Sequence, residues 1–233
     1  MEEAGRQFRV IARIHTDFPT KFGIPRQSGL IDELKAEIIF EPEYRNPDAL
    51  RGLEAFSHIW LIWEFSEARR ETWSPTVRPP RLGGNKRIGV FATRSPFRPN
   101  PIGLSSVRLE SVEFHTERGP ILHVSGADLM DGTPIYDIKP YLAFADSHSE
   151  ASGSYTDQTK EYGLHVEIPK ELESKIEESK RSALRAVLSH DPRPSYQNDP
   201  NRIYGMEFGG YEVKFRVCEG CLIVSEIEKQ LNN

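Results

Sequence analysis

The chain has 233 residues, a formal net charge of −5 at neutral pH and only two cysteines. A chain of this length buries enough apolar surface to fold without disulfides. Its longest unbroken apolar run, 59–63, is far shorter than the roughly 20 residues that a membrane-spanning helix requires. The first ten residues contain no apolar block and resemble no secretory signal. These features predict a soluble, cytoplasmic protein that is not bound to a membrane.

Strands dominate the first half of the chain. Segments rich in Val, Ile and aromatic residues are typical of strands, and the predicted strands are 8–14, 35–40, 55–65, 104–114 and 121–124. The third of these is the most apolar and is expected to lie at the centre of the core. Between the second and third, Asn46 followed by Pro47 is typical of a helix N-terminus and predicts a short helix that ends at Gly52.

Proline and glycine divide the rest of the chain. Residues 72–103 are dense in both, so most of this stretch is predicted to be a stiff, ordered loop. The polar stretch 146–163 is the best candidate for a linker. After Pro169, apolar residues recur at helical spacing as far as Leu188 and predict one long helix, and two or three strands follow it.

Familiar motifs for nucleotides, nucleophiles and metals are absent from the sequence. No Rossmann glycine fingerprint, phosphate-binding loop, nucleophile elbow or zinc-protease motif occurs. Cys218 and Cys221 supply only two of the four ligands of a structural zinc, and no second pair completes the set. They are therefore predicted to flank a turn between strands 211–217 and 222–227, with half of a metal or redox site as the alternative. No metal is expected.

Positive charge is concentrated in the segment 69–98, which holds eight Lys and Arg residues against one Glu and so carries +7, leaving −12 on the rest of the chain. Such clustering suits a partner that bears phosphates. A solvated basic loop is the alternative. The candidate RNA-binding residues in this segment are Arg69, Arg70, Arg78, Arg81 and Arg98.

Four loop segments combine charge with stiff backbone. Arg94 lies in 93–103, where flanking prolines lower the entropy cost of holding a guanidinium against an anion. Three carboxylates lie within 128–141, and they could bind hydroxyls or an ammonium group, or simply form a turn. The segment 22–29 places an amide and a guanidinium beside a proline. In 191–196, Arg193 could clamp RNA or could only follow a helix end.

Together these segments resemble the TrmO family, also called TsaA-like or YaeB-like proteins. The matching pieces occur in order along 8–145, and an ordered set of this kind is far more specific than any single piece. They are KFGIPRQ at 21–27, RGLEAFSH at 51–58, RPPRLGGN at 78–85, GVFATRS at 89–95, FRPNPIG at 97–103, DGTP at 131–134 and DIKPY at 137–141. The segment DPRPSY at 191–196 extends the resemblance towards the C-terminus.

The resemblance implies a mainly β protein with a β-barrel-like N-terminal domain at 1–145, a linker at 146–163 and a small α+β domain at 164–233. It implies a homodimer that takes S-adenosylmethionine as methyl donor in a non-Rossmann site. The implied substrate is the threonylcarbamoyladenosine at position 37, beside the anticodon, in threonine-accepting tRNA, which is methylated at N6. The implied cofactor contacts are Pro25, Arg26, Gln27, Ser66, Glu67, Arg94, Leu104, Asp131, Gly132, Thr133 and Pro134.

A methyl transfer from a sulfonium chiefly requires that the reacting atoms be held in line, and a base is useful for the departing proton. Asp137 is the candidate base because it lies close in sequence to the expected cofactor turn at 131–134; its alternative role is to accept hydrogen bonds from backbone amides. Two other functions stay open on the sequence. One is a non-catalytic nucleic-acid-binding regulator, and the other is an S-adenosylmethionine-binding protein that acts on a small molecule.

Overall fold

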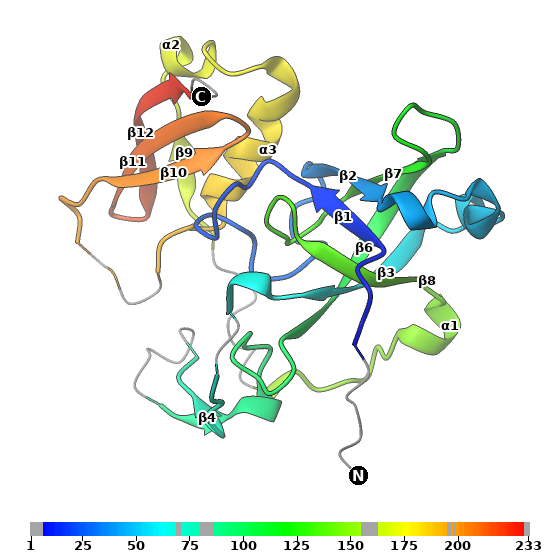
Figure 1. Ribbon diagram of the computed structural model, residues 1–233. Helices are drawn as coiled ribbons and strands as arrows, with labels where there is room; N and C mark the ends of the chain where they lie inside the picture. Colours follow the sequence, from blue (N-terminus) through cyan, green and yellow to red (C-terminus); the bar gives the residue numbers. More distant parts are fainter. Residues whose placement is uncertain are drawn as a thin grey trace.

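The computed structural model describes residues 7–68, 71–79, 86–154, 163–194, 197 and 199–230. Six antiparallel strands close into a barrel in the order β1-β2-β7-β6-β3-β8 (Figure 1). Antiparallel pairing of β1 with β8 closes it. The strands are β1 Ala12–His15, β2 Lys35–Phe40, β3 His58–Glu64, β6 Ile102–Glu113, β7 Ile121–Ser125 and β8 Pro134–Pro140.

Most barrel strands alternate buried and exposed side chains, because successive residues of a strand point to opposite faces. In β6, Ser105, Val107 and Leu109 point into the barrel while Leu104 and Arg108 point outward. The interior is filled by apolar side chains from all six strands, among them Ile14, Ile59 and Leu61. A barrel packed in this way has no room for a ligand at its centre, so binding groups are expected at its ends and on its outer face.

The C-terminal part is a four-stranded sheet in the order β10-β11-β12-β9, packed against a helix. Only β9 and β12 pair in parallel. Its elements are β9 His165–Glu167, α2 Lys170–Glu173, α3 Glu178–Ser189, β10 Tyr204–Phe208, β11 Tyr211–Cys218 and β12 Cys221–Lys229. The predicted fold class, a β-barrel followed by a small α+β unit, is therefore confirmed.

Several local predictions differ from the structure. The first strand begins at Ala12 rather than at residue 8. The short helix is the 3-10 helix η2, Pro47–Leu50, and the Asn46 side chain accepts a hydrogen bond from the Asp48 N–H as an N-cap does. The prediction of a single long helix after Pro169 is wrong: α2 ends at Glu173, and α3 begins at Glu178 after Glu177, whose backbone is not helical. The expected hairpins around 118–120 and Cys218/Cys221 are both present.

Short elements complete the structure. Within the Pro- and Gly-rich stretch, β4 Thr76–Val77 pairs with β5 Ile88–Gly89, and the 3-10 helix η6, Val90–Ala92, follows. The remaining ones are η1 Pro42–Tyr44, η3 Leu53–Ala55, η4 Ser66–Ala68 and α1 Ala143–Asp146. Over the described residues, no helix is long and apolar enough to cross a membrane.

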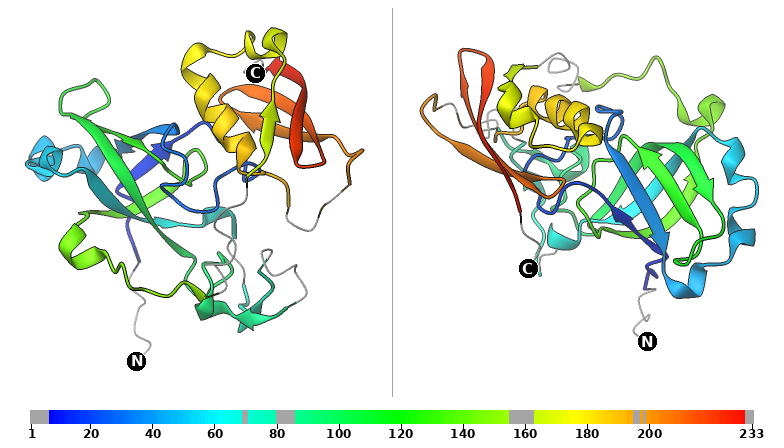
Figure 2. Two further views of the ribbon diagram at one scale, coloured as in Figure 1. Left: turned by 180° about the vertical axis from the view of Figure 1, so that it is seen from behind. Right: turned by 90° about the horizontal axis from the view of Figure 1, so that it is seen from above.

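The loop that joins β1 to β2 belongs to the core of the C-terminal part. Phe18, Ile31 and Leu34 are buried among residues of α3, β10, β11 and β12. Phe18 meets Phe208 edge-on at 5.4 Å between ring centroids. Figures 1 and 2 show this dark blue loop between the barrel and the C-terminal sheet. It therefore fixes the two parts against each other.

Gly23 lets this loop approach β10 closely. Its φ is +95°, and a Cβ at this position would lie 2.3 Å from the Sδ of Met206, which is buried. In the same loop, Gly29 also has positive φ, at +72°, but a Cβ there would meet nothing within 4 Å.

We therefore expect Gly23→Ala to destabilise the protein more than Gly29→Ala. The left-handed backbone destabilises both variants by about 1–2 kcal/mol, and overpacking destabilises Gly23→Ala by roughly 1–3 kcal/mol more. Urea unfolding of the two variants and the wild type measures the difference. Equal losses of unfolding free energy in the two variants would show that the contact with Met206 is not a constraint.

Candidate functional site

The tip of the β1–β2 loop carries the first group of predicted cofactor residues, Pro25, Arg26 and Gln27. Its base is fastened to the C-terminal part, since the Gly209 N–H donates to the Asp17 carbonyl at 2.8 Å and Lys180 pairs with the Asp17 carboxylate. The tip is therefore held between two cores although it has no regular structure of its own.

The structure brings Gln27 and Arg94 together. The Arg94 Nη1 donates a hydrogen bond to the Gln27 Oε1, and the Gln27 Nε2 donates to the Arg26 carbonyl. Arg94 follows η6, and the residues on either side of it are linked, since the Thr93 Oγ1 accepts from the Ser95 N–H at 3.2 Å. Two predicted segments, 67 residues apart in sequence, thus contribute to one polar cluster.

Beneath this cluster lies a chain of hydrogen bonds that enters the barrel. The Trp63 Nε1 donates to the Ser105 Oγ at 3.0 Å, and the Ser105 hydroxyl donates to the Asp128 Oδ1 at 2.6 Å. Burial raises the pKa of Asp128, while hydrogen bonds from Ser105 and the Ser28 backbone N–H and the charge of Arg94 oppose that rise. Asp128 therefore connects the barrel interior to the loop tip and to Arg94.

The turn 131–134 lies against the start of the same loop. The Asp131 Oδ1 accepts the Thr16 N–H at 3.0 Å and lies 3.2 Å from the His15 Nδ1. The Asp131 N–H donates to the Phe18 carbonyl at 2.8 Å. Gly132 takes a positive φ, and Thr133 and Pro134 are buried as the chain enters β8. This turn and the loop tip therefore both belong to one assembly built around the β1–β2 loop.

The remaining predicted cofactor residues lie around β3. Ser66 and Glu67 begin η4, directly after β3, and the Glu67 carbonyl accepts from the Lys21 Nζ at 2.9 Å. Leu104 pairs with Ile62 across β3 and β6 and points outward, with 58 % of its surface exposed.

Asp137, the candidate base, pairs with Ile62 on the opposite side of β3 and is half exposed. The row Leu104–Ile62–Asp137 thus crosses the strands. The Asp137 Oδ1 accepts the Ile138 N–H at 2.9 Å, and its Oδ2 pairs with Lys139 at 2.8 Å. The alternative expected for this residue, hydrogen bonding to a backbone amide, is therefore present.

The predicted RNA-binding residues comprise some outside the described residues, two beside the short elements of the Pro- and Gly-rich stretch, and Arg193 in the C-terminal part. Arg69, Arg70 and Arg81 lie outside the described residues. Arg78 is exposed beside β4, and the Arg98 Nη1 donates to the Thr93 carbonyl at 2.8 Å.

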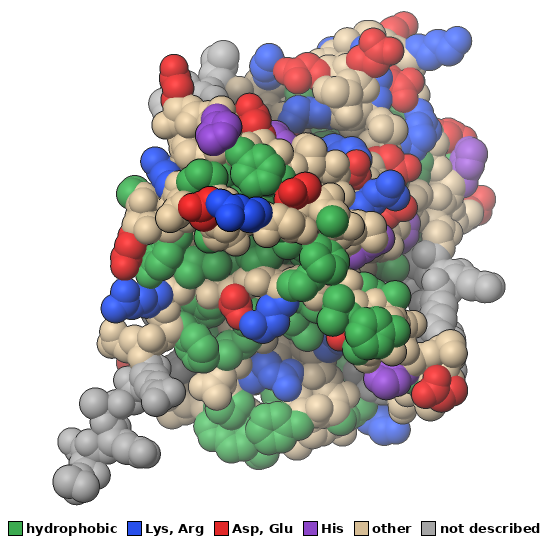
Figure 3. Space-filling view, turned by 90° about the vertical axis from the view of Figure 1, so that its right-hand side faces the viewer, with side chains coloured by type: hydrophobic (Ala, Val, Ile, Leu, Met, Phe, Trp, Pro, Cys, Tyr) green, Lys and Arg blue, Asp and Glu red, His purple; other side chains and the backbone are tan. Residues whose placement is uncertain are grey.

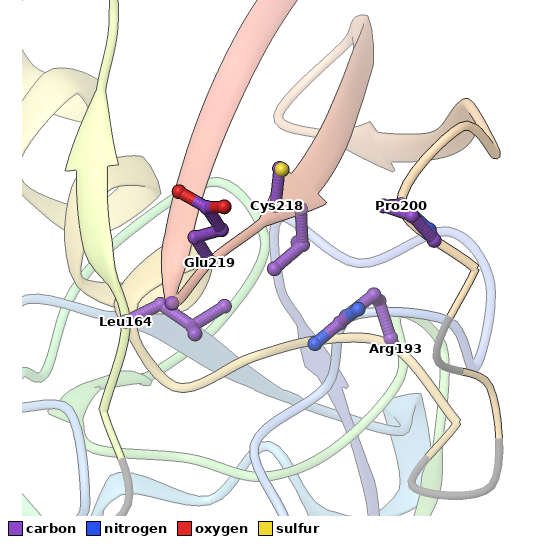
Figure 4. Close-up of a pocket in the computed structure, with 7 residues that line it drawn as sticks. Leu164, Arg193, Pro200, Cys218 and Glu219 are labelled. Carbon is purple, nitrogen blue, oxygen red and sulfur yellow. The ribbon is translucent and has the colours of Figure 1, made fainter.

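Arg193 is placed differently from the other predicted RNA-binding residues. Its side chain is 6 % exposed, and its Nε and Nη2 donate to the two carboxylate oxygens of Asp191 at 2.8 and 2.9 Å. It lines a cleft of about 210 Å³ in the C-terminal part, with Leu164, Pro200, Cys218 and Glu219 (Figure 4). A direct contact with RNA would require this ion pair to open.

Sequence reasoning counted Asp128 among the three carboxylates of 128–141 but assigned it no role of its own, and it did not select Ser105 or Trp63. One signal was available: Ser105 is a polar residue at an inward position of an alternating strand, where a hydrogen-bond partner is expected. Among the described residues, no group of three His, Cys, Asp or Glu side chains is arranged to hold a metal ion.

Comparison with known proteins defines the class to which this barrel belongs. The sequence model of the tRNA-methyltransferase O N-terminal domain matches residues 13–147, and that of the TrmO C-terminal domain matches residues 159–230. The chain therefore belongs to the TrmO family, as the sequence motifs predicted.

Individual relatives agree with this assignment. The chain is 41 % identical over 230 residues to the tRNA (adenine(37)-N6)-methyltransferase of Escherichia coli K12, covering 95 % of this chain and 97 % of that protein. It is 39 % identical to a putative S-adenosylmethionine-dependent methyltransferase, RcsF, of Pseudomonas aeruginosa, covering 87 % and 89 %. A crystal structure of TrmO from P. aeruginosa superposes with a TM-score of 0.79 at 32 % identity, covering 98 % and 99 %.

The pKa values of Asp128 and Glu110 are shifted in opposite directions, so the pH dependence of stability tests the burial of Asp128. Burial raises the pKa of Asp128 above its ordinary value of 3.8, so its ionisation lowers the free energy of unfolding as the pH rises through that raised pKa. The unfolding free energy of the wild type minus that of Asp128→Asn is expected to fall between pH 4 and pH 7.

Glu110→Gln is the control of opposite sign. Hydrogen bonds from Ser125 and Lys35 lower the pKa of Glu110, so the wild type should gain stability over this variant as the pH rises from that lowered pKa to the ordinary value of 4.5. Urea titrations that begin below this window and extend to pH 7 measure both differences. An Asp128 difference that stays constant or rises with pH would contradict the burial of its carboxyl group.

Proposed function

We propose that this protein is an S-adenosylmethionine-dependent tRNA methyltransferase that methylates N6 of the adenosine at position 37. The observation that carries the proposal is the assembly of the family's motif residues around the β1–β2 loop, with Arg94 bound to Gln27 at its tip. The relative from E. coli, matched over nearly the whole of both chains, is named for this reaction. An enzyme acting on tRNA would work in the cytoplasm.

The side chains of the assembly suit the polar end of S-adenosylmethionine. Its carboxylate matches the fork of Arg94 and the amide of Gln27, and its ammonium matches Asp131. Leu104, which is mostly exposed on the outer face of the barrel, offers an apolar contact for the adenine. We assign Pro25, Arg26, Ser66, Glu67, Gly132, Thr133 and Pro134 to the backbone and rim of the same site.

S-adenosylmethionine supplies an activated methyl group on its sulfonium, so the protein must chiefly orient the acceptor and accept its proton. With the cofactor bound, the methyl–sulfur bond would break as the N6–methyl bond forms, S-adenosylhomocysteine would leave as a neutral thioether, and N6 would lose a proton. We keep Asp137 as the proposed acceptor of that proton: it is half exposed and lies in the same cross-strand row as Leu104. Lys139, at 2.8 Å, pairs with the Asp137 carboxylate while that group is ionised, before it accepts the proton.

The proposed partners are RNA and a second copy of the chain. Arg69, Arg70, Arg78, Arg81 and Arg98 are assigned to phosphate binding, and Arg193 stabilises the loop after α3 unless its pair with Asp191 opens. Leu142 and Phe144 are each more than a third exposed, and we propose that a homodimer covers such surface. Figure 3, which faces the barrel side of the molecule, shows hydrophobic side chains reaching the surface in several groups between charged ones.

We expect Arg94→Ala and Asp131→Asn each to weaken S-adenosylmethionine binding. Removal of a charge-assisted hydrogen bond costs about 1.5–3 kcal/mol, which is roughly ten- to hundredfold in Kd. Asp131→Asn keeps an oxygen for the Thr16 N–H, so it tests the charge more than the turn.

Calorimetric titration with S-adenosylmethionine measures both variants. Arg118→Ala is the control, because Arg118 pairs with Glu37 near the β6–β7 hairpin and should leave the affinity unchanged. Wild-type affinity in both site variants would refute the placement of the cofactor.

The proposed substrate already carries the threonylcarbamoyl group, in threonine-accepting tRNA. An acyl substituent makes the N6–H more acidic, and its own carboxylate gives the arginines a specific group to bind. A site with donors placed for that carboxylate discriminates against RNA that lacks it, because the donors would then stay unpaired.

Methyl transfer to one threonine tRNA transcript, before and after enzymatic threonylcarbamoylation, tests this substrate. We expect the modified transcript to be methylated at least tenfold faster, the effect of about 1.4 kcal/mol. Equal rates would leave an adenine methyltransferase without this specificity, and no transfer to either RNA would refute the proposed function.

A further inference from the structure

The lobe formed by 71–79 and 86–100 exposes large aromatic side chains. Trp73 is 52 % exposed and Phe91 is 71 % exposed, whereas Val90 is buried. The lobe is tied together by the β4–β5 pair and by a hydrogen bond from the Val90 N–H to the Pro75 carbonyl at 2.9 Å. It projects from the barrel below the C-terminal sheet (Figure 1). Adjacent exposed aromatic rings on a projecting lobe are typical of an interaction surface.

The exposed rings are arranged as a platform. The centroids of Trp73 and Phe91 lie 6.1 Å apart, with 32° between the ring planes. The Arg98 guanidinium lies over the Phe91 ring at 5.9 Å from its centroid. Arg98 is held there by its hydrogen bond to the Thr93 carbonyl. Two aromatic faces and one planar cation therefore adjoin one another.

The charge of the lobe is opposite to that of the molecule. Its described residues carry five cationic side chains, Arg78, Lys86, Arg87, Arg94 and Arg98, against Glu71. The whole chain has a net charge of −5. A partner for this surface must therefore offer negative charge together with flat apolar faces. Unpaired nucleotides combine phosphates with base faces that stack on aromatic and guanidinium groups.

We propose that Trp73, Phe91 and Arg98 form a stacking platform for unpaired bases of the RNA substrate, beside the phosphate contacts of the surrounding arginines. The inference rests on the proposed function and adds to it the side chains that bind the unpaired segment. A platform of this kind favours a target adenosine in a loop over one in a duplex, because paired bases present their faces to each other. Phosphate contacts supply affinity, and stacking selects the unpaired segment.

The test compares two RNAs by fluorescence anisotropy: a labelled anticodon stem-loop and the same strand annealed to its full complement. Stacking is worth about 1–3 kcal/mol per base, so Trp73→Ala and Phe91→Ala should each weaken stem-loop binding about tenfold. Their affinity for the duplex should stay within twofold. Trp73→Phe retains a ring and should keep most of the affinity.

Ile203→Ala is the control, because Ile203 is a large apolar side chain that is 62 % exposed but lies directly before β10, outside the lobe. It should bind both RNAs as the wild type does. Arg78→Ala should weaken both RNAs alike and reduce the salt dependence of binding, as loss of a phosphate contact does. Unchanged S-adenosylmethionine affinity in every variant verifies that the site and the fold are intact.

Three results would overturn the platform. The first is wild-type affinity for the stem-loop in both alanine variants, and the second is an equal loss of affinity for the stem-loop and the duplex. The third is that Trp73→Ala dissociates a dimer while RNA affinity is retained, which would assign the surface to self-association. If the alanine variants bind normally while the wild type methylates tRNA, the platform fails and the proposed function stands. If stem-loop binding falls as expected but the wild type transfers no methyl group, the platform stands and the proposed function fails.

Discussion

The packing of the β1–β2 loop into the core of the C-terminal part is the constraint on which the candidate site depends. Phe18, Ile31 and Leu34 are buried among C-terminal residues, while the strands at both ends of the loop belong to the barrel. The loop tip, with Arg26 and Gln27, is therefore fixed by two cores. A binding loop held in this way loses little conformational entropy when it binds its ligand.

The polar contacts of the site complement this apolar clamp. Asp128 is held from inside the barrel by Ser105 and Trp63, and it meets Ser28 and the charge of Arg94 at the loop tip. Arg94 itself belongs to the lobe that bears Trp73 and Phe91. One proposed cofactor ligand and the proposed RNA platform thus share one segment, which gives a physical reason for cofactor and RNA to meet there.

Local patterns were sufficient for much of this structure. Alternation and β-branched content predicted most of the barrel strands, and the ordered motifs predicted the family and the residues that converge on the loop. The division at 146–163 was drawn from composition, which carries no information about the packing of Phe18 against Phe208 across more than 180 positions. The role of Asp128 could not be predicted because its partners, Ser105 and Ser28, come from distant segments. The break between α2 and α3 was missed because it occurs within a run of good helix formers.

Hydrogen–deuterium exchange of the full chain, with and without S-adenosylmethionine, tests most directly whether the cofactor binds at this doubly anchored loop. We expect slower exchange in 22–29, 93–95 and 128–134, and little change in the β11–β12 hairpin that borders the cleft at Arg193. Protection confined to residues 163–230, or exchange unchanged in all three segments at saturating cofactor, would contradict the site.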